Sequence, residues 1–260
     1  MQLVVLGSGT SVFHPQRAAA GFWLETAAGS MLLDCSADAP HRMAQEGLDW
    51  VNVEAIWISH MHLDHCGGLA PFLFGIKWAA TAGRRRQPLK IFGCAGIEKL
   101  LKATDETYGY RLFEQPFPLE IHEIQAHQEA ESFALLPGLK LETISTPHRA
   151  ESLAISIADA SGRLVYTSDT GYSEKLGEFA RDADLLILEC SFFRDKPAPK
   201  HLELIDAMKI ANLAQPKQVL LTHLYEVWDR VDLEAEAAKL WRGKTIAARD
   251  GLRLEIVNQT

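Results

Sequence analysis

The sequence predicts an α/β fold in which two similar halves form a single domain over residues 1–260. Short apolar runs of strand length alternate with longer segments of helical pattern along the chain, and the mixture in the first half recurs in the second. No low-complexity linker separates the halves. A chain of 260 residues can also bury a sizeable core without disulfides or a structural metal.

In the first half, apolar runs bounded by Gly, Pro, Asp or Ser predict strands, and the longer segments between them predict helices. The predicted strands are 2–6, 20–25, 30–34, 53–59 and 89–92, and the predicted helices are 38–46, 69–80 and 96–107. The basic run Arg84-Arg85-Arg86 is expected to be a solvated turn, and Trp57, Trp78 and residues 72–74 are expected in the core and the pocket wall.

The second half follows the same rules. The predicted strands are 119–124, 132–135, 139–144, 153–158, 164–168, 185–189, 218–222, 244–248 and 252–257, and the predicted helices are 172–180, 201–212 and 232–240. The last two strands are expected to pair around the turn Asp250-Gly251, because such a dipeptide between two apolar runs is typical of a hairpin.

Composition excludes several classes of protein. The chain has 26 Lys and Arg against 34 Asp and Glu, a net charge of −8, with 47% hydrophobic residues. That is too apolar for a disordered chain, while runs such as Leu185-Leu186-Ile187-Leu188 are too short to span a bilayer. The acidic balance argues against a general nucleic-acid binder. The four widely spaced cysteines and the absence of a signal-peptide pattern predict free thiols and a cytoplasmic protein.

The strongest chemical signal is a compact cluster at the end of a predicted strand. Residues 60–65 read His-Met-His-Leu-Asp-His, and imidazole and carboxylate are ligands that zinc prefers. A chain that turns after a strand can aim His60 and His62 one way and Asp64 and His65 another, which suits two adjacent metals. The alternative is a chance histidine cluster on a surface loop.

Further polar residues follow three later strands. His148 follows the strand at 139–144, Asp169 the strand at 164–168, and His223 the strand at 218–222. In α/β folds such strand ends gather active-site residues, so these three are candidate ligands. Taken singly, each could instead be a capping aspartate or a buried structural histidine.

With these residues in place, the sequence resembles the metallo-β-lactamase-fold hydrolases, whose hallmark H-x-H-x-D-H is present as His60 to His65. The resemblance covers nearly the whole chain and implies a four-layer αββα sandwich with a dinuclear site, most often of zinc, although manganese or iron occupies similar sites. It implies that His60, His62 and His148 hold the first metal, that Asp64, His65 and His223 hold the second, and that Asp169 bridges the two.

Within this fold the chain is most similar to the ribonuclease Z-like branch and its phosphodiesterase relatives. The resemblance rests on Gly7-Ser8-Gly9-Thr10, on Ser168-Asp169-Thr170, on Leu188-Glu189-Cys190-Ser191 and on a histidine at position 201. In those phosphodiesterases the corresponding histidine is proposed to help the leaving group. Two features depart from ribonuclease Z itself: only 20 residues separate His148 from Asp169, too few for its tRNA-grasping arm, and Leu224-Tyr225-Glu226 lacks its Ser-x-Arg-Tyr pattern.

The expected function is therefore a dinuclear-zinc phosphodiesterase acting on a small phosphodiester or a short nucleic acid. Asp64 or Asp169 would orient the nucleophile, and His201 would donate a proton to the leaving group. Asp34 and Glu189 either support ligand histidines or simply end strands. The alternatives are a carboxylic ester, lactone or thioester hydrolase, a tRNA 3′-end endonuclease, or an inactive metal-binding protein. Because relatives are often dimers, the resemblance also allows a homodimer.

Overall fold

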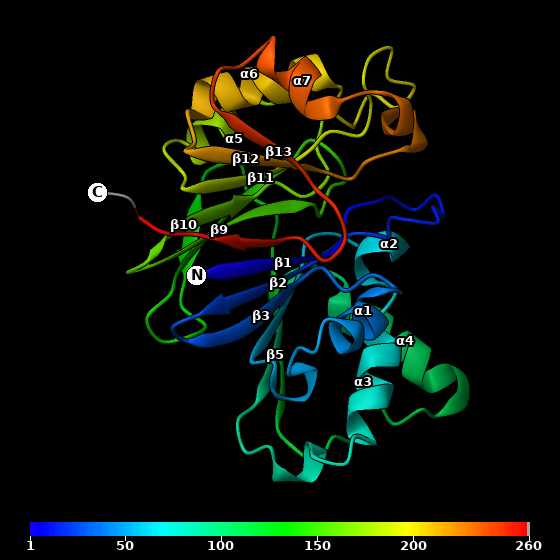
Figure 1. The fold of residues 1–260 in the computed structure, drawn as a ribbon. Helices are drawn as coiled ribbons and strands as arrows, with labels where there is room; N and C mark the ends of the chain where they lie inside the picture. Colours follow the sequence, from blue (N-terminus) through cyan, green and yellow to red (C-terminus); the bar gives the residue numbers. More distant parts are fainter. Residues whose placement is uncertain (259–260) are drawn as a thin grey trace.

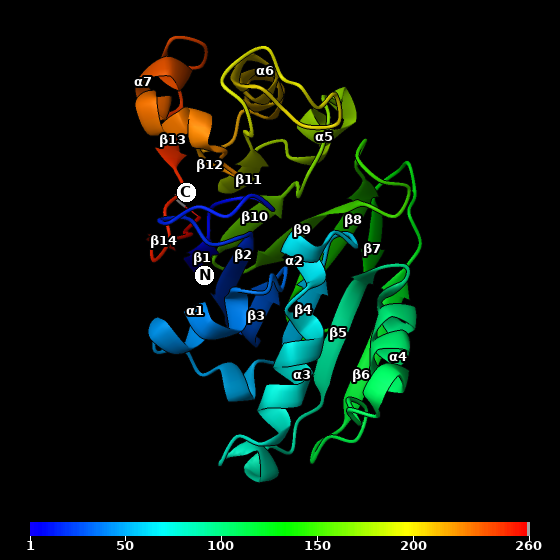
Figure 2. The same ribbon diagram turned by 90° about the vertical axis from the view of Figure 1, so that its right-hand side faces the viewer.

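A computed structural model describes residues 1–258, so the last two residues of the predicted 1–260 domain lie outside the described part. Within this part, two seven-stranded sheets face each other, and helices cover the outer face of each sheet. Figure 1 and Figure 2 show the four layers from two directions. This confirms the α/β class and the αββα sandwich.

The first sheet has the strand order β14-β1-β2-β3-β4-β5-β6. Its strands are β1 (Gln2–Gly7), β2 (Gly21–Thr26), β3 (Gly29–Leu33), β4 (Ala55–Ile58), β5 (Leu89–Cys94), β6 (Leu119–Ile124) and β14 (Arg253–Glu255). Pairing is antiparallel from β14 to β3 and parallel from β3 to β6. The carboxyl ends of β3 and β4 therefore lie at the same edge of the sheet.

The second sheet repeats this plan with the order β13-β12-β11-β10-β9-β8-β7. Its strands are β7 (Glu131–Phe133), β8 (Lys140–Ser145), β9 (Leu153–Asp159), β10 (Gly162–Tyr166), β11 (Leu185–Glu189), β12 (Gln218–Thr222) and β13 (Lys244–Ala247). Pairing is antiparallel from β7 to β10 and parallel from β10 to β13. The carboxyl ends of β10, β11 and β12 thus also meet at one edge.

Helices form the two outer layers. Those of the first half are α1 (Ala39–Gln45), α2 (Leu63–Cys66), α3 (Leu69–Lys77) and α4 (Ile97–Tyr108), and those of the second half are α5 (Glu174–Phe179), α6 (Leu204–Ala214) and α7 (Leu233–Ala238). Short 3-10 helices lie at Trp50–Asn52, Ala82–Arg84 and Glu226–Arg230. Among the described residues, no helix is both long and apolar enough to cross a bilayer.

The main core lies between the sheets and is strongly apolar. The rings of Phe22 in the first sheet and Tyr166 in the second meet edge to face, with centroids 5.2 Å apart. Trp57 and Phe92 pack at the same distance on neighbouring strands. Helices cover the opposite face of each sheet, so both faces of the central strands are buried, which explains uninterrupted apolar runs such as 55–58.

The expected pairing of the last two strands is wrong. β13 pairs with β12 in the second sheet, whereas β14 pairs with β1 in the first. The Asp250-Gly251 turn carries the chain from one sheet to the other, and it is held there because Gly251 N donates to Val5 O at 2.8 Å. A turn signal between two apolar runs is the same for a hairpin and for such a crossover.

Two other expectations also need correction. Arg85 is not in a solvated turn but is buried, and its guanidinium donates to the carbonyls of Val51, Gln87 and Pro88. Trp78 and Phe74 are 72% and 45% exposed, so they lie outside the core, and neither lines the cavity beside His62 and Asp64. Helical periodicity does not distinguish a residue that faces the sheet from one just past that face.

The helix predicted to begin at His201 begins instead at Leu204. The segment before it is tied to other groups: Leu202 N donates to the Glu189 carboxylate at 3.1 Å, and Leu204 N donates to Phe192 O at 2.9 Å. These bonds keep residues 201–203 outside the helix and leave the His201 side chain beside the carboxyl end of β11.

Candidate metal centre

Tight turns at strand ends aim the predicted ligands at a common point. The backbone is left-handed at Asp34 after β3 (φ 57°), at Ser168 after β10 (φ 56°) and at His223 after β12 (φ 60°). Such a conformation costs a non-glycine residue about 1–3 kcal/mol and is concentrated at functional sites. Each turn bends the chain sharply where a sheet ends, so polar side chains leave the sheets at one edge.

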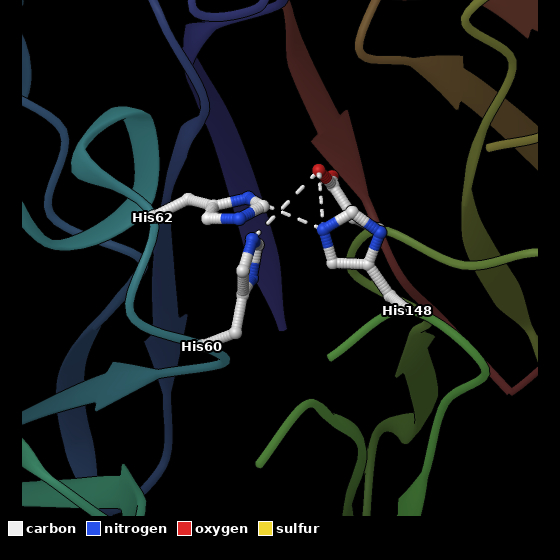
Figure 3. Close-up of side chains that lie close together, drawn as sticks. His60, His62 and His148 are labelled. Atoms are coloured by element: carbon white, nitrogen blue, oxygen red, sulfur yellow. Dashed lines mark hydrogen bonds and ion pairs between the residues drawn. The ribbon is translucent and has the colours of Figure 1, made fainter. Parts of the chain in front are cut away.

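The structure brings all seven predicted ligands together, in two groups. His60, His62 and His148 lie with Asp169, and their ligand atoms are all within 4.8 Å of one another. Figure 3 shows the rings of these three histidines converging from two sides, His60 and His62 from one and His148 from the other. Asp64, His65 and His223 form the second group, within the same distance.

The carboxylate of Asp169 lies between the two groups. Its Oδ1 is 3.2 Å from His65 Nε2 and 3.4 Å from His223 Nε2, both in the second group. Its Oδ2 is 3.8 Å from the Nε2 atoms of His60 and His148, both in the first. Each oxygen of Asp169 thus faces a different group of histidines.

Hydrogen bonds at Nδ1 determine which nitrogen of four histidines faces the centre. His65 Nδ1 donates to Asp34 at 2.7 Å, and His148 Nδ1 donates to Lys200 O at 3.0 Å. The hydroxyls of Ser59 and Ser191 donate to carboxylates, so they accept from Nδ1 of His60 and of His223. With Nδ1 held in this way, the Nε2 atom of each of the four rings lies toward Asp169, and that of His148 also lies 3.2 Å from Nδ1 of His62.

Asp34 holds residues of the centre in place through hydrogen bonds, as one of the two sequence interpretations expects. Its fully buried carboxylate accepts from Ser59 N at 2.8 Å, Ser59 Oγ at 2.9 Å, His65 Nδ1 at 2.7 Å and Tyr166 Oη at 2.7 Å. Tyr166 belongs to the second sheet, so this network also joins the two halves. A carboxylate that holds a ligand histidine orients its ring and raises its basicity.

Glu189 performs a similar task beside the second group. It is buried and accepts from Thr170 N at 2.5 Å, Leu202 N at 3.1 Å and Ser191 Oγ at 2.7 Å. Its Oε1 also lies 3.2 Å from Nδ1 of His201. Burial lowers the pKa of His201, but the hydrogen bond to Glu189 outweighs it and raises that pKa above the usual value.

Burial and neighbouring charges shift the pKa values of the cluster. Desolvation lowers the pKa of His60, His62 and His148, so these rings are neutral near pH 7. Burial acts the same way on His65, but Asp169 and Asp34 outweigh it and raise its pKa. Burial alone would raise the pKa of Asp169, yet His223 and His65 hold it well below the usual range, so the carboxylate stays ionised.

The residues present fit a metal ion. In the described part of the chain, the Nε2 atoms of His60, His65 and His223 are buried without a hydrogen-bond partner. Such orphaned polar atoms are costly unless something else binds them, and a cation bound in each of the two groups would satisfy all three. The donor set of five imidazoles and two carboxylates suits zinc, manganese or iron.

Three residues of the centre escaped the sequence interpretation. Ser59, Ser191 and Tyr166 bind the carboxylates and rings that orient the ligands. Ser59 and Ser191 stand directly beside residues already singled out, so their position was a usable signal. Tyr166 ends an apolar strand like many others and carries no such mark. Two amides of the Gly7-Ser8-Gly9-Thr10 turn already donate hydrogen bonds within the fold and do not face a phosphate, since Ser8 N donates to Asp250 and Gly9 N donates to Ala18 O.

Comparison with known proteins places the chain in a family. The profile of the anti-Pycsar protein Apyc1 matches residues 1–246. A probable metallo-hydrolase, YhfI of Bacillus subtilis, is 28% identical over 96% of this chain and 98% of its own length.

Two solved structures share the fold. Human tRNase Z, short form, superposes with a TM-score of 0.81 at 21% identity, covering 98% of this chain and 99% of its own. A diphosphatase of the PhnP family superposes with a TM-score of 0.72 at 23% identity, covering 98% and 97%. Taken with the His and Asp cluster between the sheets, these matches show that the chain is a metallo-β-lactamase-fold hydrolase and belongs to the family of the anti-Pycsar protein Apyc1.

Proposed function

We propose that this metal-dependent hydrolase is a dinuclear-zinc phosphodiesterase that acts on a small phosphodiester or a short nucleic acid. The position of the Asp169 carboxylate is the observation that carries the proposal, because one oxygen faces each group of histidines. In this proposal His60, His62 and His148 would hold one ion, Asp64, His65 and His223 would hold the other, and Asp169 would bridge them.

The reaction is hydrolysis. A water oxygen adds to phosphorus, the bond from phosphorus to the leaving oxygen breaks, and the leaving oxygen takes up a proton. When bound, the two zinc ions supply a nucleophile at neutral pH and neutralise the phosphate oxygens. The ionised carboxylates of Asp64 and Asp169 accept hydrogen bonds from the attacking water and orient it, since the pKa of each is lowered.

His201 is the group best placed to protonate the leaving oxygen. Its ring stacks on that of His223 with centroids 5.4 Å apart, and its Nδ1 lies 3.9 Å from the Asp169 carboxylate. Glu189 holds the ring and raises its pKa, so a larger fraction carries a proton near neutral pH. Alkoxide leaving groups need such a proton, whereas thiolate and activated aryl leaving groups do not.

The chain offers little for a long RNA. Between His148 and Asp169 the structure has only the β9 and β10 hairpin, in place of an extended arm. The net charge of −8 also opposes the binding of many phosphates. Both observations favour a small substrate over a tRNA precursor.

The test replaces His201 with Ala and compares two substrates. Turnover of a dialkyl phosphodiester should fall by about 10²–10⁴, the usual contribution of a positioned acid. Bis(p-nitrophenyl) phosphate, whose leaving group needs no proton, should lose much less, and metal content should not change. His122→Ala, at an exposed histidine on β6, is the control. Unchanged turnover of the dialkyl ester would remove His201 from the mechanism.

A broader screen separates the proposal from its alternatives. The metal-loaded protein is tested on phosphodiesters, lactones, thioesters, carboxylic esters and precursor tRNA. The proposal predicts the highest kcat/KM on a small phosphodiester. Higher values on a lactone or thioester would assign the chain to carboxylic ester chemistry, and specific 3′ cleavage of the tRNA would assign it to tRNA processing.

The proposal extends to the setting of the enzyme. We propose that it works in the cytoplasm, which the four buried free thiols support because they need no oxidising compartment. We also propose a homodimer. The exposed aromatic rings of Phe74 and Tyr110, with centroids 6.1 Å apart, and the nearby Trp78 form an apolar face that supports it. Light scattering on the purified protein measures the oligomeric state directly.

A further inference from the structure

The loop between β1 and β2, residues 8–20, is anchored at its neck, where Ser8 and Gly9 approach Ala18. The carboxylate of Asp250 accepts from Ser8 N at 3.0 Å, Ser8 Oγ at 2.8 Å and Ala18 N at 2.8 Å. Gly9 N donates to Ala18 O across the neck at 2.8 Å. The two ends of the loop therefore hold each other and the turn that joins the two sheets.

The outer part of the loop is fastened to the segment that follows His223. Asp229 accepts from Arg17 at 2.5 Å and lies 3.0 Å from Nε2 of His14. Leu224 N donates to Ser8 O at 2.9 Å. The loop is thus attached to both halves of the molecule and stands beside the metal centre as a fixed ledge, seen in dark blue near α2 in Figure 1.

This fixed ledge carries apolar side chains that the fold does not use. Phe13 is 100% exposed and Val12 is 53% exposed. Leu63, which stands between His62 and Asp64, is 73% exposed. Fully burying a side chain of this size stabilises a protein by about 1.5–3 kcal/mol, and these three contribute little of that to the fold. Exposed apolar groups gathered at a site mark a surface that contacts a ligand.

A cavity of about 1020 Å³ lies between the ledge, α1 and the metal centre. It is lined by Phe13, Val12 and Leu63, and also by His62 and Asp64 from the two groups of proposed ligands. His201 does not line it. A phosphodiester held at the centre would therefore reach this cavity with the ester arm opposite to the one that His201 protonates.

On the basis of the proposed phosphodiesterase activity, we infer that this cavity receives the ester arm that stays on the phosphate, and that Phe13 selects a planar aromatic arm over a small alkyl one. A ring in the arm can stack on Phe13 while its edge meets Leu63. Aromatic rings and branched apolar side chains are the usual partners for such a group. Phe13 is thus a specificity-determining residue of the same site.

The experiment varies the retained arm and keeps the leaving group constant. Phenyl p-nitrophenyl phosphate and methyl p-nitrophenyl phosphate release the same p-nitrophenol, and the product is phenyl phosphate or methyl phosphate. The wild-type enzyme should prefer the phenyl ester in kcat/KM. Phe13→Ala should lower the phenyl-to-methyl ratio about tenfold, within the range for stacking of a base on an aromatic side chain. Phe13→Trp should keep the preference.

Tyr108→Ala is the matched control, since Tyr108 is an aromatic residue that is 81% exposed and does not line the cavity, and both kcat/KM values should stay the same. A wild-type ratio near one, or an equal loss on both esters in Phe13→Ala, overturns the inference while leaving the phosphodiesterase intact. The inference is also overturned if Phe13→Ala changes the oligomeric state of the protein but leaves the phenyl-to-methyl ratio of kcat/KM unchanged. Failure of the wild type to hydrolyse either ester would instead remove the proposed function, and this inference with it.

Discussion

Every buried histidine that faces Asp169 depends on a neighbour that holds its Nδ1. Two serine hydroxyls, one carboxylate and one backbone carbonyl do this for four rings. The consequence is that Nε2 of all four rings points inward, and in His60, His65 and His223 it has no hydrogen-bond partner among the described residues. A preformed arrangement of this kind reduces the entropy that ligand binding would otherwise cost.

Asp34 provides the sharpest test at this scale. Its side chain holds the ring of His65, so Asp34→Asn should weaken zinc binding by about 10–100-fold, as loss of such a supporting carboxylate usually does. Asparagine tolerates the left-handed backbone at this position, so the turn itself should survive. Zinc affinity is measured by competition with a chromophoric chelator.

The matched control is Asp184→Asn. Asp184 is also a buried carboxylate and accepts from Arg163 N at 2.7 Å, but it precedes β11, at the strand end opposite to the metal centre. This variant should lose stability and keep its zinc affinity. If Asp34→Asn binds zinc as tightly as the wild type, Asp34 has only a structural role.

At the scale of elements, the site depends on how closely the turns pack at the strand ends. A Cβ added to Gly7, at the end of β1, would lie 1.8 Å from Ala19 O. By contrast, a Cβ added to Gly75, inside α3, would meet nothing within 4 Å. Gly7 is therefore required because there is no space for a side chain, whereas the surroundings of Gly75 place no such steric requirement on it.

We expect opposite effects from the two alanine substitutions. Gly75→Ala should raise the free energy of unfolding by about 0.5–1 kcal/mol, because alanine loses less backbone entropy in a helix. Gly7→Ala should lower it by about 2 kcal/mol or more, since the backbone must move to relieve the clash. Urea denaturation of the two variants measures both values. Equal stability of Gly7→Ala and the wild type would show that the neck of the loop is not tightly packed.

Sequence patterns predicted most elements but not all of their partners. Strands such as 185–189 and 218–222 were found at their observed positions because apolar runs and turn residues are local signals. The placement of β13 and β14 in different sheets is not predictable in this way, since it depends on which sheet each strand joins. The delayed start of α6 was missed for a similar reason: Glu189 competes for the Leu202 amide, and a single sequence does not show that contact.

The candidate site was more predictable than the fold. The cluster at 60–65 and the polar residues after three later strands were all recognisable, because a strand end near the sheet edge is a local feature. The supporting network was only half recognisable. Asp34 and Glu189 were singled out with two interpretations each, and contacts between residues far apart in the sequence decided between them, such as the bonds from His65 and Tyr166 to Asp34.

For the whole molecule, the cysteines offer an independent check on packing. All four are buried and free, in both halves of the fold. Burial raises the pKa of every one of these thiols, that of Cys66 to about 11. At pH 8 they should therefore remain protonated and inaccessible in the native state.

Iodoacetamide with mass spectrometry tests this expectation. The native protein at pH 8 should gain no adduct during an incubation that labels all four thiols in urea. Rapid labelling of any cysteine without denaturant would show that the sheets or their helices open more readily than this packing allows.

The net charge of the whole chain differs from the charge expected at the metal site. Its net value is −8, but Asp64 and Asp169 face the proposed metals, which would bring about four positive charges. The site would then be far less acidic than the surface around it. A small anion can be attracted to such a site, while a long polyanion would also meet the acidic surface.

Metal content is the most direct test of the central claim. The protein is purified without chelators, saturated with zinc, freed of excess metal and measured by inductively coupled plasma mass spectrometry. The proposed centre predicts two metal ions per chain in the wild type and a loss of both in Asp169→Ala. Fewer than about one ion per wild-type chain, with none recovered on adding zinc, would contradict the dinuclear centre.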